Sequence, residues 1–196
     1  MSLILASGSG ARRKMLEAAG LAFEVEIPRV DEEAAKASLR GQGLAPHAQA
    51  EALAELKALS VSRKRSGFVI GADQMLSLGG SAFDKPASLA EAREHLQRLR
   101  GKTHELVTAA VVASDGQVIW RHTETPQLSM REFSNVFLDA YLNKAGEGAL
   151  SSVGAYQLEG VGAQLFERVR GDYFSVLGLP LLPLLAFLRE HAIVPA

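Results

Sequence analysis

Apolar residues along the chain follow two patterns, short runs typical of buried strands and longer stretches with helical spacing. The short or alternating runs predict strands at residues 3–6, 23–27, 68–72, 105–113, 118–123 and 164–169. The helical stretches predict helices at residues 11–19, from 46 onward, after 88, and at 134–144 and 179–190. Strands and helices therefore alternate, which predicts an α/β domain with a mixed β-sheet flanked by helices.

Glycine and capping residues mark the ends of several of these elements. Gly20 fits the C-terminal cap of the first helix, and Ser88 with Glu91 forms a capping-box pattern. Asp115-Gly116 lies between two strand-like runs and predicts an antiparallel hairpin. The sequence contains no repeat or long linker, so we expect one domain over residues 1–196, with two close lobes around a central cleft as the alternative.

The composition narrows the class of protein. Hydrophobic residues make up 47% and charged residues 22% of the 196 residues, which excludes a disordered or fibrous chain. The net charge of −1 gives no field that would hold a nucleic-acid polymer. Any anionic ligand must therefore be bound by a local cluster of cations.

The chain has no cysteine, which excludes disulfides, thiolate metal sites and a cysteine nucleophile. We expect a cytoplasmic protein on this ground. The most apolar late stretch, residues 176–188, contains two prolines and is shorter than the ~20 residues that span a bilayer. No membrane partner is expected.

The turn Ser7-Gly8-Ser9-Gly10 follows the first strand and precedes a helix. Free backbone N–H groups converge at such a helix start and can bind an anion. The first helical turn carries Arg12, Arg13 and Lys14, which oppose the helix dipole by roughly 0.3–1 kcal/mol each at an exposed site. A bound phosphate would reverse that sign, whereas a capped helix with solvated basic residues is the alternative.

Carboxylates and lysines elsewhere fit the same chemistry. Asp73 follows the run 68–72, so we expect it at the end of a strand, where open α/β sheets place ligands. A carboxylate there can hold Mg²⁺ and orient a water molecule. Asp31-Glu32-Glu33 offers further oxygen ligands or is a solvated loop, and Lys57 and Lys85, taken alone, are typical surface lysines. Together these residues indicate phosphoryl chemistry.

Other catalytic motifs are absent from the sequence. Arg13 stands where a dinucleotide fingerprint needs its third glycine or alanine, and no P-loop occurs. The five histidines lack zinc-protease spacing, and no Gly-x-Ser-x-Gly elbow is present. These absences argue against dinucleotide enzymes, zinc hydrolases and esterases.

Several motifs occur in one order and at spacings that match a known family. They are Leu5-Ala6-Ser7-Gly8-Ser9 with Arg12, Val30-Asp31-Glu32, Lys57, Gly71-Ala72-Asp73-Gln74, Lys85-Pro86, Gly154-Ala155-Tyr156, Glu159-Gly160 and Gly178-Leu179-Pro180. Across nearly its whole length the sequence resembles the Maf family of nucleotide pyrophosphatases. The resemblance implies a fold related to inosine triphosphate pyrophosphatases, a divalent cation (Mg²⁺ or Mn²⁺), a nucleoside triphosphate substrate and a homodimer. It also implies hydrolysis between the α and β phosphates.

The resemblance also implies roles for individual residues. Ser7, Ser9 and Arg12 would hold the phosphates, and Lys57 and Lys85 would stabilise the transition state.

Two carboxylates complete the set of residues implied by the resemblance. Glu32 and Asp73 would bind the metal, and Asp73 would also act as the general base on the attacking water.

Two further positions bear on the base of the nucleotide. Family members that favour dTTP and UTP carry Thr after the catalytic Asp and Gln before the later Gly, whereas members similar to the 7-methyl-GTP enzyme carry Gln and Glu. This chain has Gln74 and Glu159, and guanine offers two adjacent donors to a carboxylate. Ala11 departs from both groups. The 7-methyl-GTP group has Trp at this position, whose face would attract a methylated guanine by about 0.5–2 kcal/mol, and the dTTP/UTP group has Arg. We expect Trp120 to pack in the hairpin rather than to replace that residue.

Three functional hypotheses follow. The first is a pyrophosphatase for a modified purine of the 7-methyl-GTP type. The second keeps the reaction but changes the substrate to dTTP, UTP or a broad set. The third is a non-catalytic, nucleotide-binding regulator of cell division.

Overall fold

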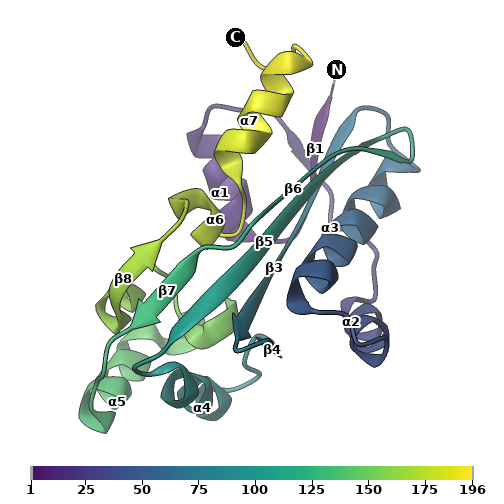
Figure 1. The fold of residues 1–196 in the computed structure, drawn as a ribbon. Helices are drawn as coiled ribbons and strands as arrows, with labels where there is room; N and C mark the ends of the chain where they lie inside the picture. Colours follow the sequence, from purple (N-terminus) through teal and green to yellow (C-terminus); the bar gives the residue numbers. More distant parts are fainter. Residues whose placement is uncertain (1, 196) are drawn as a thin grey trace.

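An eight-stranded mixed sheet forms the centre of the protein, with helices on both faces (Figure 1). The structure is a computed structural model and describes residues 2–195. Six strands follow the order β2-β1-β3-β5-β7-β8, while β4 pairs with β3 and β6 pairs with β5. The strands are β1 (Leu3–Ala6), β2 (Glu24–Val25), β3 (Phe68–Leu78), β4 (Ser81–Phe83), β5 (Thr103–Ser114), β6 (Gln117–Glu124), β7 (Gln127–Met130) and β8 (Phe166–Arg170).

Strand β1 runs parallel to β2 and β3, and the other pairs are antiparallel. The predicted mixed α/β sheet is therefore confirmed. The hairpin of β5 and β6 turns at Asp115 and Gly116, whose positive φ angles of 50° and 75° suit the expected tight turn.

The helices begin close to the predicted positions. Side-chain oxygens of Ser9, Ser88 and Ser134 each accept a hydrogen bond from the backbone N–H three residues later, which confirms the expected starts. The helices are α1 (Gly10–Ala18), α2 (Glu32–Gly41), α3 (Pro46–Ser62), α4 (Leu89–Leu99), α5 (Asn135–Ala145), α6 (Tyr173–Val176) and α7 (Leu181–Glu190). Three 3-10 turns, η1 (Gly146–Leu150), η2 (Val153–Ala155) and η3 (Val161–Leu165), form the glycine-rich stretch.

One expectation from the sequence is wrong, and one of the alternatives left open is excluded. Strand β3 does not end at Asp73 but continues to Leu78, because β5 pairs with it continuously from Val69 to Ser77 and β4 pairs with its last residues. The acidic cluster is not a loop: the Asp31 carboxylate caps α2 by accepting from Ala34 N at 3.0 Å. Glu32 then begins the helix, where negative charge suits the dipole. The sequence did not predict β4, β7 or the short helix α6, because these segments have no clear apolar pattern.

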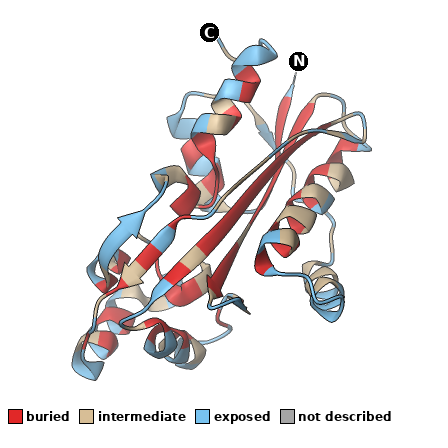
Figure 2. Cartoon of the chain, in the orientation of Figure 1, coloured by how far each residue is buried: buried red, intermediate tan, exposed pale blue. Residues whose placement is uncertain are grey.

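Alternate residues of the sheet pack against helices on opposite faces. Leu5, Ile70 and Val112 belong to the core with α1 and α7, whereas Met75 and Val107 belong to the core with α3. A further core lies around α4 and α5, and the central strands are buried along most of their length (Figure 2).

Trp120 packs beside the core that contains α7. Its ring stacks on Phe187 with centroids 5.4 Å apart, which confirms its expected structural role. Among residues 2–195, no helix has the length and apolar character needed to cross a membrane.

Candidate active site

The edge of β3 is open between its two neighbours β1 and β4. The parallel ladder with β1 ends at Ala6 and Gly71, and the ladder with β4 begins at Leu76. In the described part of the chain, residues 72–75 of β3 therefore have no strand partner on this edge. Asp73 thus lies just beyond the carboxyl end of β1, which is the position where open α/β sheets bind ligands.

A buried lysine joins two carboxylates at this opening. Lys57 Nζ on α3 lies 2.7 Å from Asp73 Oδ1 on β3 and 2.8 Å from Glu32 Oε2 at the start of α2. The side chains of Lys57 and Asp73 are 6% and 9% exposed, whereas that of Glu32 is 42% exposed. One buried cation therefore holds a buried and a half-exposed carboxylate at one point.

Close packing of α3 on β3 explains how Lys57 reaches Asp73. A Cβ atom at Gly71 would lie 2.3 Å from the carbonyl oxygen of Ala54 and 2.6 Å from the nitrogen of Ala58. Only glycine permits this approach of helix backbone to strand backbone. Asp73 is two residues further along β3 and so faces the same helix.

Arg12 enters the same region from α1. The guanidinium is buried, with Nε donating to the carbonyl oxygen of Gly178 at 2.7 Å and Nη1 donating to Ser7 Oγ at 3.3 Å. Burial lowers the pKa of Arg12, and the charges of Asp73 and Glu32 act in the opposite direction. Arg12 thus lies within the field of both carboxylates.

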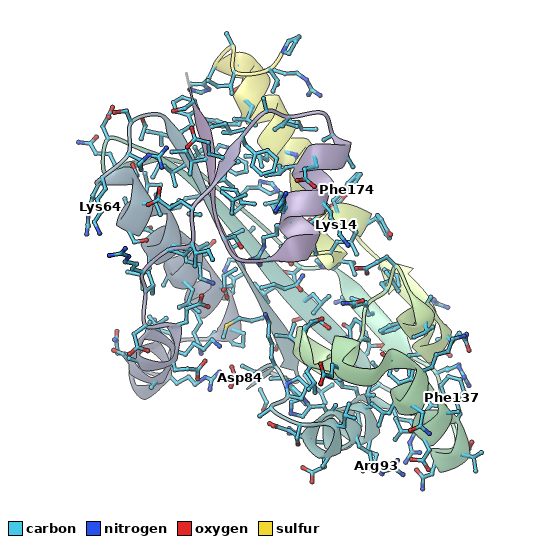
Figure 3. The ribbon with its side chains drawn as sticks, turned by 180° about the vertical axis from the view of Figure 1, so that it is seen from behind. Lys14, Lys64, Asp84, Arg93, Phe137 and Phe174 are labelled. Atoms are coloured by element: carbon cyan, nitrogen blue, oxygen red, sulfur yellow. The ribbon has the colours of Figure 1, made fainter. Side chains whose placement is uncertain are left out.

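The neighbouring cations of α1 behave differently. Arg13 is exposed and pairs with Glu17 at 2.7 Å, and Lys14 lies on the outer surface of α1 (Figure 3). Of the three basic residues in the first turn, only Arg12 is directed to the cluster around Lys57.

Lys85 follows β4 at the other side of the opening. Its side chain is exposed, but neighbouring protein atoms remove part of the hydration of its ammonium group. Desolvation lowers the pKa of Lys85, and repulsion by Arg12 and Lys57 adds to this shift. The three predicted cations therefore share one electrostatic field, which an anion would relieve.

Ser7 and Ser9 shape the turn between β1 and α1. Ser7 Oγ accepts from the backbone N–H of Ser9 at 3.2 Å as well as from Arg12, while Ser9 Oγ accepts from Arg12 N at 3.4 Å. Gly8 and Gly10 have open space where a Cβ atom would stand. This turn brings the N-terminus of α1 to the side of the buried arginine.

The two residues predicted to read the base lie apart from these contacts. Gln74 is next to Asp73 on a strand and faces the opposite side of the sheet. Gln74 Nε2 donates to Thr108 Oγ1 at 2.8 Å and to the carbonyl oxygen of Ser175 at 2.9 Å. Glu159 is in an exposed turn between η2 and η3 and makes no hydrogen bond or ion pair with another residue of the range 2–195.

Sequence reasoning gave no role to two residues near the opening. Lys36 and Asp84 form an ion pair at 3.4 Å, and Asp84 directly precedes Lys85. A signal was present in the four-residue spacing of Glu32, Lys36 and Arg40, which places the three on one helix face.

The two carboxylates fit a divalent cation. Glu32 and Asp73 both approach the same ammonium group, so they converge on one positive charge. Within residues 2–195 no group of three or more His, Asp or Glu side chains could hold a metal ion by itself. Magnesium commonly uses one or two carboxylates and completes its shell with water and substrate phosphate.

The fold and the site define an α/β protein with a cation cluster and two carboxylates at the carboxyl end of a parallel strand. Residues 2–191 match the family described as Maf-like protein, and the chain belongs to this family.

The relatives that match include enzymes with two different names. A nucleoside triphosphate pyrophosphatase of Hyphomonas neptunium is 53% identical over 195 residues, covering 100% of this chain and 98% of its own. A 7-methyl-GTP pyrophosphatase of Rhizobium johnstonii is 53% identical over 189 residues, with 96% and 95% coverage. The alignment with a solved dITP/XTP pyrophosphatase of Mycobacterium abscessus covers 100% of this chain and 98% of that chain, with a TM-score of 0.42 and 14% identity.

Proposed function

We propose that this protein is a metal-dependent nucleoside triphosphate pyrophosphatase. It hydrolyses the bond between the α and β phosphates and releases a nucleoside monophosphate and pyrophosphate. The observation that carries the proposal is the convergence of Lys57, Asp73 and Glu32, with Arg12 and Lys85 in the same field. Two relatives that are 53% and 56% identical over nearly the whole chain are named nucleoside triphosphate pyrophosphatase.

The cations bind and orient the triphosphate. The N-terminus of α1 offers free N–H groups, and Arg12 is held rigidly by Ser7 and by the carbonyl oxygen of Gly178. Lys57 and Lys85 add positive charge around the phosphates, where negative charge increases in the transition state. Fixed positions matter because a preorganised charge needs no rearrangement during the reaction.

The carboxylates serve the metal and the water. Glu32 and Asp73 would hold the divalent cation, which when bound neutralises phosphate charge. The Asp73 carboxylate accepts a proton from the attacking water. The water oxygen forms a bond to the α phosphorus. The bond from this phosphorus to the oxygen that bridges the α and β phosphates breaks, and pyrophosphate leaves with the electron pair of that bond.

The preferred base within this reaction is a modified purine of the 7-methyl-GTP type. Gln74 and Glu159 match that subgroup, and some relatives at about 50% identity carry its name. A broad or dTTP/UTP preference is the second candidate, because Ala11 lacks an aromatic face and the amide of Gln74 already donates within the protein.

The first test is pyrophosphate release with Mg²⁺ or Mn²⁺ from 7-methyl-GTP, GTP, dTTP, UTP and CTP. Preference for 7-methyl-GTP supports the purine assignment, whereas preference for dTTP or UTP overturns it. Release from none of them favours a nucleotide-binding regulator of cell division.

The second test is Asp73→Asn, with Asp139→Asn on exposed α5 as the matched control. We expect hydrolysis to fall by at least about a hundredfold in Asp73→Asn, as for loss of a general base, while calorimetry shows nucleotide binding largely retained. The control should keep full activity, because Asp139 is exposed and, among residues 2–195, its carboxylate pairs with Arg93 alone. Unchanged turnover in Asp73→Asn would contradict the mechanism.

A further inference from the structure

Helix α2 carries Glu32 but has little apolar attachment to the protein. None of its residues is buried, and only Ala35 and Leu39 pack against the core beside α3. An isolated helix of 10 residues is unstable in water, so contacts with the rest of the protein decide where α2 lies. Ionic contacts therefore contribute a large share of its attachment.

Two of these contacts end on one carboxylate outside the helix. Asp84 Oδ1 lies 2.8 Å from Arg40 Nη2 and 3.4 Å from Lys36 Nζ. Asp84 lies beside α2, in the segment that joins β4 to α4 (Figure 3). The hydrogen bond from Arg40 lowers the pKa of Asp84, so the carboxylate is charged at neutral pH.

The polar face of α2 links this contact to the candidate active site. Glu32, Lys36 and Arg40 are four residues apart and so follow one face of the helix. The first of them contacts Lys57 at 2.8 Å, and the other two contact Asp84. One rigid helix thus connects the predicted metal ligand Glu32 to the residue that precedes Lys85.

The same face also affects Lys85 through its charge. Desolvation and the charges of Arg12 and Lys57 lower the pKa of Lys85, and the charge of Lys36 acts in the same direction. Lys36 thus adds to the positive charge that acts on Lys85, and its own ammonium is paired with Glu33 and Asp84.

We propose that Asp84 is a positioning residue, which ties α2 to the Lys85 segment and so fixes Glu32 and Lys85 relative to each other around the bound triphosphate and metal. The roles of Glu32 and Lys85 rest on the proposed function. Asp84 itself touches neither reacting atoms nor metal in this scheme. Its effect passes through the position of α2.

Hydrogen exchange measures that position without any turnover. Asp84→Asn keeps the shape of the side chain and removes its charge, and Asp139→Asn breaks an exposed pair with Arg93 as the matched control. Because exposed ion pairs contribute modestly, we expect α2 amides to exchange about three- to tenfold faster in Asp84→Asn. Amides of α3 and α4 should not change, and Asp139→Asn should leave α2 unaffected.

Salt and a conservative variant sharpen this measurement. High salt should accelerate exchange of α2 in the wild-type protein but have little further effect in Asp84→Asn, because ions screen the contact. Asp84→Glu keeps the charge and should restore part of the protection. Unchanged exchange of α2 in Asp84→Asn, or equal acceleration throughout the protein, would overturn the proposal.

Kinetics give the second readout. In Asp84→Asn we expect kcat/KM for pyrophosphate release to fall several-fold, mainly through a higher KM. Glu32 and Lys85 would no longer be held in the positions that bind metal and substrate. A fall in kcat alone with unaltered KM would contradict the positioning role. If the wild-type protein hydrolyses no nucleotide, the proposed function fails, while the exchange experiment still decides whether Asp84 holds α2.

Discussion

The replacement Lys57→Met tests whether one buried ammonium holds the candidate site together. Methionine keeps the length and apolar stem of lysine but removes the cation between Asp73 and Glu32. The Asp73 side chain is only 9% exposed and would be left as a buried charge without its nearest partner. Glu32 is 42% exposed and can turn toward water.

The expected loss of stability follows from this burial. Removal of one partner from a buried ion pair costs about 3–5 kcal/mol. Arg12 lies within the field of Asp73 and supplies some compensating positive charge, so we expect about 3 kcal/mol, at the lower end of that range. Domains commonly have about 5–15 kcal/mol of unfolding free energy, so this loss is easily measured.

Arg13→Met provides a control with the same contact distance and different burial. Arg13 pairs with Glu17 at 2.7 Å, the same distance as between Lys57 and Asp73, but the side chains of Arg13 and Glu17 are 61% and 48% exposed. Urea unfolding at neutral pH in the presence of a chelator should show a loss below about 1 kcal/mol for this variant. Titration with Mg²⁺ should then stabilise Lys57→Met by about 2.7 kcal/mol at a hundredfold excess over its Kd, and should stabilise the wild-type protein by less.

Two results would refute this reasoning. A loss in Lys57→Met no larger than that in Arg13→Met would show that the buried pair does not stabilise the fold. Equal stabilisation of the wild-type protein and Lys57→Met by Mg²⁺ would show that the metal does not take the place of the ammonium between the carboxylates.

Three further predictions concern other parts of the fold. Burial lowers the pKa of His104 from 6.5 to about 4, so the folded state favours the neutral ring. The contribution of His104 to the unfolding free energy is therefore complete above about pH 6.5 and falls by roughly 3 kcal/mol toward pH 4. Urea unfolding of His104→Gln should show a shallower pH dependence than that of the wild-type protein. Gly71→Ala should lower the melting temperature and weaken hydrolysis of every nucleotide, because its Cβ would press α3 and Lys57 away from β3; an unchanged melting temperature would contradict that packing. Gln74→Ala should lower the melting temperature, because it removes the hydrogen bonds of the Gln74 amide to Thr108 on β5 and to two carbonyl oxygens of α6; a changed ratio of 7-methyl-GTP to dTTP hydrolysis with unaltered melting temperature would contradict this and assign Gln74 to the base.

The sequence by itself determined those features that depend on near neighbours. The strand at Leu3–Ala6, the serine cap of α1 and the hairpin turn at Asp115-Gly116 each follow from a few consecutive residues. The mixed sheet followed from their alternation. Residues for the phosphates and metal came from motifs at matching spacing, and the family match over residues 2–191 supports that resemblance.

Only the tertiary structure decided how these residues combine. The length of β3 depends on its register with β5, so no pattern inside residues 68–72 could show that the strand continues past Asp73. Arg12 is buried and Arg13 is not, because the chain of α6 and Gly178 comes back to cover one side of α1. The family motif singled out Arg12, but no local pattern showed that the Arg12 side chain is buried and that of Arg13 exposed.

The ion pairs of the site show the same limit most clearly. Lys57 meets Asp73 because Gly71 lets α3 approach β3, and it meets Glu32 because α2 packs beside α3. Asp84 contacts Arg40 of α2 from the segment after β4, more than forty positions later in the chain. These contacts join separate elements. The distance between two elements depends on their packing and register, which cannot be derived from any local stretch of sequence.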